Sequence, residues 1–469
     1  MNGEEGQQLR GIDATFLYAE TPRAHMHTLK LLMLDVREMP GGYRFERLVA
    51  ALASAVSRLP NWRSQICFAP LDLDHPCWVP DPTFDIHAHV DRIRLATGDA
   101  ASLDRVVSDY LSTPLPRDRA LWHATVIEGL EDGTVALAMK VHHCLADGAA
   151  FARVLRSITS PVRQQLLPPA PLVRTDAQPL LARREKVFRR ALVAFVRRIA
   201  RMPWLIVRTL LGDLRRSWLR RRTGESAAFL FRGPSTPVNR PLSPRRAFSR
   251  ASVSLADVSA VKKVYGTTVN DVVLAIVGGA LQDWVRREGV DPSRALIAGV
   301  PISTDTEYDE DRRWGNQVSH VAISLETHID DPVQRLLAVQ RCALAAKAEV
   351  EAVGSDLLVR WSELANPPVM RIVWRTVPHL PRPPINMVVS NVPGPRETRY
   401  LGGAEVVELY SVGPLLEGIG LNITAWTYRD HISFGVLTSP EGLGDPSIIA
   451  AGIAPALTRL LKEATTKAA

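Results

Sequence analysis

The sequence predicts a mixed α/β protein of two halves, which a basic and apolar segment separates. Patterns typical of strands and of helices occur on both sides of that segment. Proline-containing stretches at 161–179 and 233–237 mark its ends and have the composition of linkers. With 469 residues, the chain has the length of two or three domains of roughly 150 residues. We therefore predict an N-terminal half at 1–160, a linker with basic amphipathic helices at 161–239 and a C-terminal half at 240–469.

Three segments justify this assignment in the N-terminal half. Apolar residues between Phe45 and Leu59 recur at helical spacing, and this helix should end before Pro60. Residues 134–141 form an apolar run that predicts a strand. Four apolar residues at the spacing of one helix face then predict a second helix: Phe151, Val154, Leu155 and Ile158.

The C-terminal half combines a helix with several strands. The helix should open near Thr268, because Asp271 stands three residues later, where helix N-termini favour an acceptor side chain. Five further segments predict strands, at 295–302, 318–325, 385–390, 421–427 and 431–436. The chain is 46% apolar, which is enough to bury sizeable cores in both halves.

The most informative segment lies between the strand at 134–141 and the helix that follows it. It reads HHCLADG and holds His142, His143, Asp147 and Gly148. Imidazole is the side chain best suited to accept a proton near neutral pH, such as the proton that a hydroxyl loses when it attacks a thioester. We expect Asp147 to stabilise the loop by pairing with an arginine, and Gly148 to permit a backbone bend.

This HHxxxDG pattern resembles the signature of the CoA-dependent acyltransferase superfamily. Further segments resemble blocks of one of its members, the bacterial wax ester synthase/diacylglycerol acyltransferase family, and they occur in that family's order. They are residues 11–17 with 26–27, 78–81, 84–90, 120–122 with 127–130, 270–275, 315–316, 390–395, and 413–414 with 421–423. The resemblance covers the chain from about residue 11 to about residue 440.

The resemblance implies two mixed α/β halves of the condensation-domain-like type, with the active-site channel between them. It implies an acyl-CoA-dependent O-acyltransferase that esterifies diacylglycerol to triacylglycerol. His143 would be the general base, His142 would shape the loop, and Asp147 and Gly148 would hold it. Acyl-CoA would be a co-substrate, and no metal or redox cofactor is implied.

Three alternatives remain beside this interpretation. One is a wax ester synthase that uses long-chain alcohols, and another is a weakly active, membrane-associated lipid-binding protein of the same fold. A condensation-type domain that acts on carrier-protein substrates is disfavoured, because the sequence contains no carrier-like serine segment.

The sequence departs from the family pattern at three positions. Ala120 stands where the family usually has proline, and Pro116 stands where aspartate is usual. Asp305 stands where arginine is common, and Arg312 or Arg313 could compensate for that change. These departures bear on substrate binding more than on the base.

Three further residues are candidates for substrate contact or support. Trp122 belongs to the block at 120–122. Asp271 reads from the pattern alone as an ordinary helix cap, which would stabilise the helix by about 1 kcal/mol. Asn270 could polarise the thioester or order the channel, and the resemblance favours that functional interpretation.

Other reactive side chains give weak signals. The chain has four cysteines without CxxC or other metal-ligand spacing, and we interpret Cys144, inside the motif, as a spacer thiol rather than a nucleophile. His87 and His89 alternate as metal ligands on a strand could, but no third ligand stands near them, so we predict no metal site.

The basic excess of the chain lies in residues 181–222. This segment holds 14 Lys/Arg and 2 Asp/Glu, a net charge of +12 where the whole chain has +8. Its arginines are interleaved with apolar residues, which predicts two basic amphipathic helices broken at Met202-Pro203. Such helices could lie on an anionic membrane surface, or they could connect the halves with a solvated basic face.

We expect no nucleic-acid partner, because no known binding motif accompanies the charge. No uncharged apolar run in the segment reaches the roughly 20 residues that a bilayer span needs, and no secretory leader is evident. The expected location is therefore cytoplasmic, peripherally associated with the inner face of the plasma membrane or with lipid droplets.

Overall fold

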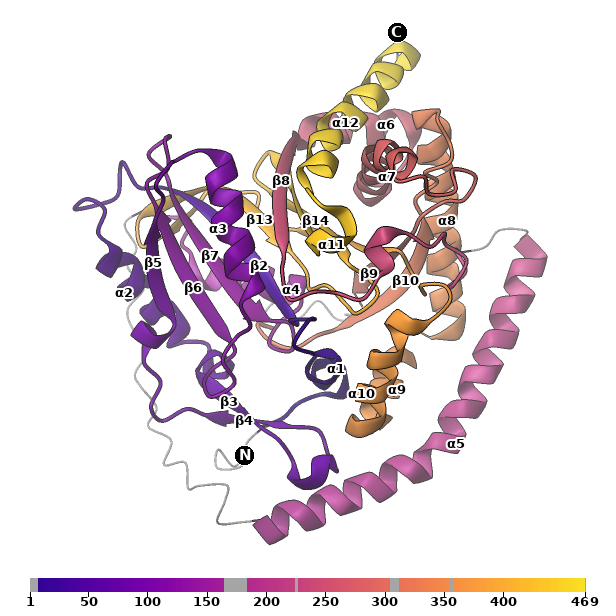
Figure 1. Cartoon of the computed structure of the whole chain (residues 1–469), viewed down its shortest axis with the longest axis horizontal. Helices are drawn as coiled ribbons and strands as arrows, with labels where there is room; N and C mark the ends of the chain where they lie inside the picture. The colour runs from indigo at the N-terminus through magenta and orange to yellow at the C-terminus, as the bar shows by residue number, and fades with distance from the viewer. Residues whose placement is uncertain (1–6, 164–183, 224–226, 304–311, 355–356, 469) are drawn as a thin grey trace.

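The computed structural model describes residues 7–163, 184–223, 227–303, 312–354 and 357–468. Its strands form two six-stranded sheets and one three-stranded sheet within these ranges. Figure 1 shows the two large sheets side by side, with most N-terminal elements around one and most C-terminal elements around the other. The predicted α/β class with two mixed halves is confirmed.

The first large sheet carries the segment with the histidine motif. Its strand order is β12-β13-β2-β7-β6-β5, and every pair is antiparallel except β5 with β6. The strands are β12 (Arg399–Leu401), β13 (Ala404–Val412), β2 (His27–Asp35), β7 (Val135–His142), β6 (Trp122–Glu128) and β5 (Val90–Arg94). The strand predicted at 134–141 is β7, shifted by one residue.

The second large sheet has the order β10-β9-β11-β14-β15-β8, with β9, β11 and β14 parallel. The strands are β10 (Val318–Ser324), β9 (Ile297–Ser303), β11 (Met387–Pro393), β14 (Leu421–Tyr428), β15 (His431–Thr438) and β8 (Ala247–Ser254). All five strands predicted in this half are present, with ends shifted by a few residues.

The two sheets do not each come from one half of the sequence. Strands β12 and β13 follow β11 in the chain, yet they extend the N-terminal sheet, where β13 pairs with β2. Strand β13 also packs against β15: a Cβ at Gly435 would lie 2.2 Å from the Ser411 carbonyl oxygen. The halves are therefore interlocked, and the boundaries at residues 160 and 240 remain a prediction.

Helices pack against the sheets, and the helix that follows the motif lies between the two large sheets, where Phe151 contacts Trp426. In the N-terminal half they are α1 (Gly11–Ala19), α2 (Phe45–Val56), α3 (Ala100–Ser112) and α4 (Gly148–Ile158). Helix α2 confirms the helix predicted from Phe45 and ends before Pro60, and α4 confirms the helix predicted after the motif. A small sheet, β1 (Gln7–Gln8), β4 (Cys77–Pro80) and β3 (Ser64–Cys67), lies beside α1.

In the C-terminal half the helices are α6 (Leu255–Tyr265), α7 (Val269–Arg287), α8 (Pro332–Val353), α9 (Leu357–Leu364), α10 (Pro367–Thr376), α11 (Pro440–Leu443) and α12 (Ser447–Ala468). Short 3-10 helices connect several elements: η1 (Pro60–Arg63), η2 (Pro70–Asp72), η3 (Ile86–Ala88), η5 (Pro237–Asn239) and η6 (Val377–His379). Within the described ranges no single helix is both long enough and apolar enough to cross a membrane. Helices α6 and α7, which are bent by 105° relative to each other, would together reach that length and apolarity.

The basic segment forms one helix, α5 (Arg184–Thr223), so the prediction of two helices broken at Met202-Pro203 was wrong. Figure 1 shows α5 along the outside of the molecule, past α9 and α10 to α8. Contacts on both sides of Pro203 hold it: Arg198 donates to the Glu363 carbonyl oxygen, and Thr209 accepts from Trp361. These contacts offset the backbone hydrogen bond that Pro203 cannot donate.

Candidate functional site

The motif loop joins β7 to α4, as its flanking patterns predict. Strand β7 ends at His142 and α4 begins at Gly148. Asp147 caps α4, because its Oδ1 accepts from the Ala150 N–H at 2.7 Å. The loop is thus fixed by a strand at one end and a capped helix at the other.

Asp147 also has the arginine partner that the sequence analysis expected. Arg312 donates from Nη1 to Asp147 Oδ2 and from Nη2 to Asp147 Oδ1, each at 3.1 Å, and both side chains are buried. The Gln317 N–H donates to Asp147 Oδ2 at 2.9 Å. The ion pair therefore ties the motif to the segment before β10. Arg312 was one of two arginines that could compensate for the aspartate at position 305. Asp305 itself lies outside the described residues.

The side chain of His143 is half-buried, whereas His142 and Asp147 of the same motif are buried. Its Nδ1 lies 3.0 Å from Asn316 Oδ1, and its ring stacks on Phe16 with centroids 4.1 Å apart and an interplanar angle of 8°. Partial removal from solvent lowers the pKa of His143 to about 4. The imidazole is therefore neutral, and able to accept a proton, at physiological pH.

His142 faces the interior of the N-terminal half. Its Nδ1 accepts from the Cys144 N–H at 3.2 Å, and its Nε2 lies 3.5 Å from Glu20 Oε2. Glu20 also pairs with Arg117, the residue after the departure at Pro116. Burial lowers the pKa of His142 well below its usual value. These contacts suit a residue that shapes the loop, although the roles of both histidines remain predictions.

Gly148 serves a different purpose from the predicted bend. The structure records no left-handed backbone at Gly148, but a Cβ there would lie 2.7 Å from Val392 Cγ2 on β11. A glycine is thus required by the close approach of β11 to the start of α4, not by a backbone bend.

Asn270 and Asp271 lie at the start of α7. Asp271 forms a capping box with Thr268: its Oδ2 accepts from the Thr268 N–H at 2.8 Å, and Thr268 Oγ1 accepts from the Asp271 N–H at 3.1 Å. Asp271 is therefore a helix-capping residue of α7, as its position in the sequence indicated. Asn270 Oδ1 accepts from Asn391 Nδ2 at 3.5 Å. Asn391 and Val392 are consecutive residues of β11, so their side chains point to opposite faces of the sheet, and Asn270 contacts the face opposite to the one that Val392 turns towards Gly148.

Trp122 is buried in the core of the N-terminal half. Its Nε1 donates to the Trp62 carbonyl oxygen at 2.8 Å, and its ring stacks on His89 with centroids 4.7 Å apart. Trp122 is thus in a position to support the sheet under the motif.

His89 Nδ1 pairs with the Trp122 carbonyl oxygen, and no group of three potential metal ligands occurs in the described part of the chain. Burial raises the pKa of the Cys144 thiol, which disfavours a nucleophilic thiolate there.

Two residues whose roles the sequence analysis missed complete the arrangement. Asn316 donates from its backbone N–H and from Nδ2 to Asp13 Oδ1, both at 2.7 Å, and from Nδ2 to the His143 carbonyl oxygen at 2.9 Å. Asp13 lies on α1, and burial raises its pKa to about 7. The signal was present, because both residues lie in blocks that resemble the family, at 11–17 and 315–316. Their position relative to His143 was not readable from spacing.

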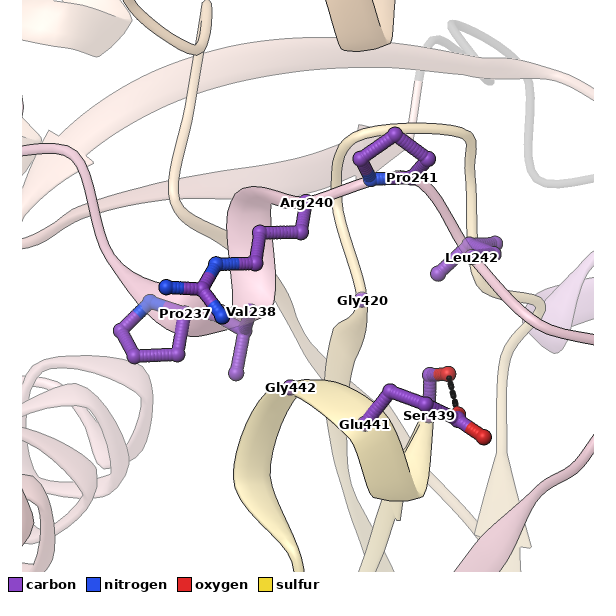
Figure 2. Close-up of a pocket in the computed structure, with 9 residues that line it drawn as sticks. All are labelled: Pro237, Val238, Arg240, Pro241, Leu242, Gly420, Ser439, Glu441 and Gly442. Atoms are coloured by element: carbon purple, nitrogen blue, oxygen red, sulfur yellow. Dashed lines mark hydrogen bonds between the residues drawn. The ribbon is translucent and has the colours of Figure 1, made fainter.

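A pocket of about 280 Å³ lies away from the motif residues (Figure 2). Figure 2 shows Ser439 and Glu441 hydrogen-bonded on α11 and its approach, opposite Arg240. Its walls are Pro237, Val238, Arg240, Pro241, Leu242, Gly420, Ser439, Glu441 and Gly442. None of these residues belongs to HHxxxDG, so we do not assign the pocket to acyl transfer.

The fold of the chain is similar to that of solved acyltransferase and condensation-domain structures. The structure resembles the wax ester synthase/diacylglycerol acyltransferase from Marinobacter aquaeolei VT8, with a TM-score of 0.70, 24% identity, and 98% of this chain and 100% of that chain covered. It also resembles the first condensation domain of the CDA synthetase, with a TM-score of 0.60, 15% identity, and 100% and 98% covered. The chain therefore shares its fold with this acyltransferase and with a condensation domain.

The amino-acid sequence matches one protein family over most of its length. Residues 9–273 match the wax ester synthase/diacylglycerol acyltransferase catalytic domain, and residues 314–461 match the WS/DGAT C-terminal domain. A relative from Mycobacterium tuberculosis strain CDC 1551, named as a candidate diacylglycerol O-acyltransferase, is 35% identical over 461 residues, 97% of this chain and 90% of the relative. One from strain H37Rv, named likewise, is 34% identical over 452 residues, 95% and 94%. The chain belongs to the wax ester synthase/diacylglycerol acyltransferase family.

Proposed function

We propose that this protein transfers the acyl group of an acyl-CoA to the free hydroxyl of a diacylglycerol, with His143 as the general base. The observation that carries the proposal is the contrast between the two motif histidines. His142 is buried against Glu20 and Cys144, whereas His143 is half-buried, and among the described residues no hydrogen bond to its Nε2 is recorded. The names of the mycobacterial relatives support a diacylglycerol acceptor.

The proposed reaction is a direct transfer in a ternary complex. His143 Nε2 removes the proton from the acceptor hydroxyl as its oxygen bonds to the thioester carbon. The carbon–sulfur bond then breaks, and the imidazolium returns the proton to the sulfur of CoA. The neutral imidazole is regenerated, and the step needs no covalent enzyme intermediate.

One product analysis separates this function from its alternatives. Purified protein is incubated with labelled palmitoyl-CoA and either diacylglycerol or hexadecanol, and the lipid products are resolved. Labelled triacylglycerol in excess over labelled wax ester supports the proposal. A wax ester as the main product favours the wax ester synthase. Lipid binding without either product favours the weakly active lipid-binding protein.

We also propose that α5 docks the protein on anionic membrane or lipid-droplet surfaces, where its hydrophobic substrates dissolve. The residues of α5 that are buried against the body recur every seven positions, two helical turns: Ala191, Arg198, Leu205 and Gly212. The opposite side is exposed and apolar, and includes Val196, Val207, Leu210, Leu214 and Trp218. An interdomain helix with a solvated basic face would not need this apolar side.

Positive charge flanks the apolar side of α5. The structure records no ion pair for Arg197, Arg201 or Arg215 within the described residues, whereas Arg198 and Arg220 pair with carboxylates of the body. Basic side chains at an anionic surface contribute about 1 kcal/mol each. The three arginines of the first group are therefore available to lipid headgroups.

Liposome co-sedimentation of the full-length protein tests this docking. Binding should rise with anionic lipid and fall with salt, because screening acts over about 8 Å at physiological ionic strength. Replacement of Arg197, Arg201 and Arg215 with Gln should weaken binding but preserve activity on detergent-dispersed substrate. Replacement of Val207, Leu210 and Leu214 with Ser should weaken it at every salt concentration. Binding that ignores both lipid charge and salt would support the interdomain-helix alternative.

A further inference from the structure

The hydrogen bonds around Asn316 determine which way its amide group faces. Asn316 Nδ2 lies 2.7 Å from Asp13 Oδ1 and 2.9 Å from the carbonyl oxygen of His143. Both partners offer lone pairs, so the group that faces them is the NH₂ of the amide. The amide oxygen, Asn316 Oδ1, is then the atom that faces His143 Nδ1 at 3.0 Å.

An amide oxygen accepts hydrogen bonds and cannot donate one. His143 Nδ1 must therefore carry the hydrogen, and in the neutral ring the lone pair lies on Nε2. The ring is restrained in this orientation, because Phe16 stacks on it and the His143 N–H donates to the Met26 carbonyl oxygen at 2.7 Å. The contacts select both the tautomer and the direction of the basic nitrogen.

Asp13 in turn holds Asn316. Its Oδ1 accepts both the backbone N–H and the Nδ2 of Asn316, which fixes the main chain and the amide together. Gly315, with φ of +73°, lets this segment approach: a Cβ there would lie 3.3 Å from Asp13 Oδ2. Asp13 and Asn316 are both buried, so the network is shielded from competing water.

From these contacts we infer that Asp13 and Asn316 are positioning residues that hold His143 as the Nδ1–H tautomer, so that Nε2 is the nitrogen that takes the acceptor's proton. The inference rests on the proposed role of His143 as base and names the residues that prepare it. Asp13 comes from α1 and Asn316 from the segment before β10, so the base is prepared by two segments that lie 303 positions apart in the sequence. Neither residue contacts a reacting atom in this scheme.

The tautomer can be measured without any reference to catalysis. Nitrogen-15 spectra of full-length protein labelled on histidine, assigned by loss of the signals in His143→Ala, should show a protonated Nδ1 and an unprotonated Nε2 at pH 7. Asn316→Ala should shift His143 toward a mixture of tautomers. An Nε2–H form in the wild type, or unchanged signals in Asn316→Ala, would overturn the inference.

Kinetics provide the second readout. Asn316→Ala should lower kcat by about 10²-fold, within the range that a misplaced base costs, while KM for palmitoyl-CoA stays within about twofold because no substrate contact is removed. Asp13→Asn should retain most of the kcat, because an amide oxygen accepts the same two bonds, whereas Asp13→Leu should lose it. Equal losses in Asp13→Asn and Asp13→Leu would contradict a positioning role through hydrogen bonding.

Thr15→Ala is the matched control on the same helix and should keep wild-type kcat, because the one hydrogen bond recorded for Thr15 Oγ1 among the described residues goes to the Gly11 carbonyl oxygen. Circular dichroism of every variant identifies a loss of kcat that reflects unfolding. If Asn316→Ala does not fold, the comparison of Asp13→Asn with Asp13→Leu carries the test. Failure of the proposed function is recognised separately. If His143→Ala retains wild-type turnover, His143 is not the base, and the tautomer measurement still reports whether Asn316 controls its ring.

Discussion

Arg312 donates one hydrogen bond to each carboxylate oxygen of Asp147, both at 3.1 Å, and this buried pair joins the two halves at the motif loop. The pair does not act alone. The same Arg312 donates to the Gly315 carbonyl oxygen, and the Gly315 N–H donates to the Leu145 carbonyl oxygen, at 2.9 and 2.8 Å. The loop that carries His143 is therefore held by a segment 165 residues away in sequence from Asp147.

Asp147→Ala should reduce both stability and activity. The change leaves the Arg312 charge buried without its carboxylate and removes the cap of α4, at a cost of about 3–5 kcal/mol. Thermal and urea unfolding measure this loss. The matched control is Asp283→Ala, which removes the carboxylate of an exposed pair with Arg286 and should leave the melting temperature nearly unchanged. If Asp147→Ala melted like the wild type but lost activity, a direct catalytic role would be indicated instead.

His143→Ala should lower turnover by roughly 10²–10⁴-fold without loss of fold, the usual effect of removing a general base. Exposed His87→Ala is the control and should keep wild-type turnover. The pH profile adds a second check. Because the pKa of His143 lies at about 4, the base is neutral above about pH 5, and kcat/KM should fall only as pH approaches 4. A fall that begins near 6.5 would contradict this environment for His143.

Asp13 should make stability depend on pH. Its pKa is about 7 in the folded protein against 3.8 when unperturbed, so the folded state binds the extra proton between these values. The contribution of Asp13 to the free energy of unfolding is therefore fully present below pH 3.8 and is lost as pH rises through 7. The loss amounts to at most about 4 kcal/mol. Asp13→Asn cannot ionise and should gain stability relative to the wild type between pH 5 and pH 8. A difference that is constant over this range would show that Asp13 ionises normally.

Local patterns predicted much of this molecule, since they depend on neighbours in the chain. The strand and helix around the motif, the helix from Phe45 and the α7 start with Asp271 were readable because periodicity and capping are local. The Asp13–Asn316 contact joins residues 303 positions apart, which no spacing reveals. The partner of β13 was equally hidden, because alternation fixes which face of a strand is buried but not which sheet it joins.

The error at Met202-Pro203 has a similar cause. A proline predicts a break from local backbone chemistry, whereas the continuous α5 depends on tertiary anchors such as Arg198 with Asp74. The basic residues of the helix also looked equivalent in sequence. Only the structure separates the arginines that pair with the body from those that flank the exposed apolar side.

That separation can be tested with adjacent residues. Arg198 pairs with Asp74 and donates to the carbonyl oxygens of Leu73 and Glu363, each at 3.2 Å. Arg198→Ala should therefore destabilise the protein by about 3–5 kcal/mol, because Asp74 is left buried and unpaired. Arg197→Ala should leave unfolding nearly unchanged and weaken binding to anionic liposomes instead. Equal effects of the two changes on unfolding would contradict the assignment of Arg198 to the protein interior.

Gly148→Ala should destabilise the start of α4 although alanine is the better helix former. The added Cβ would lie 2.7 Å from Val392 Cγ2, and overpacking of this kind costs about 1–3 kcal/mol. Val392→Ala removes the clashing methyl groups, so the double variant should be more stable than the sum of the single changes predicts. Urea unfolding of the four proteins gives the coupling energy, which should lie between about 0.5 and 3 kcal/mol. Additive effects would show that Gly148 is required for a reason other than the approach of β11.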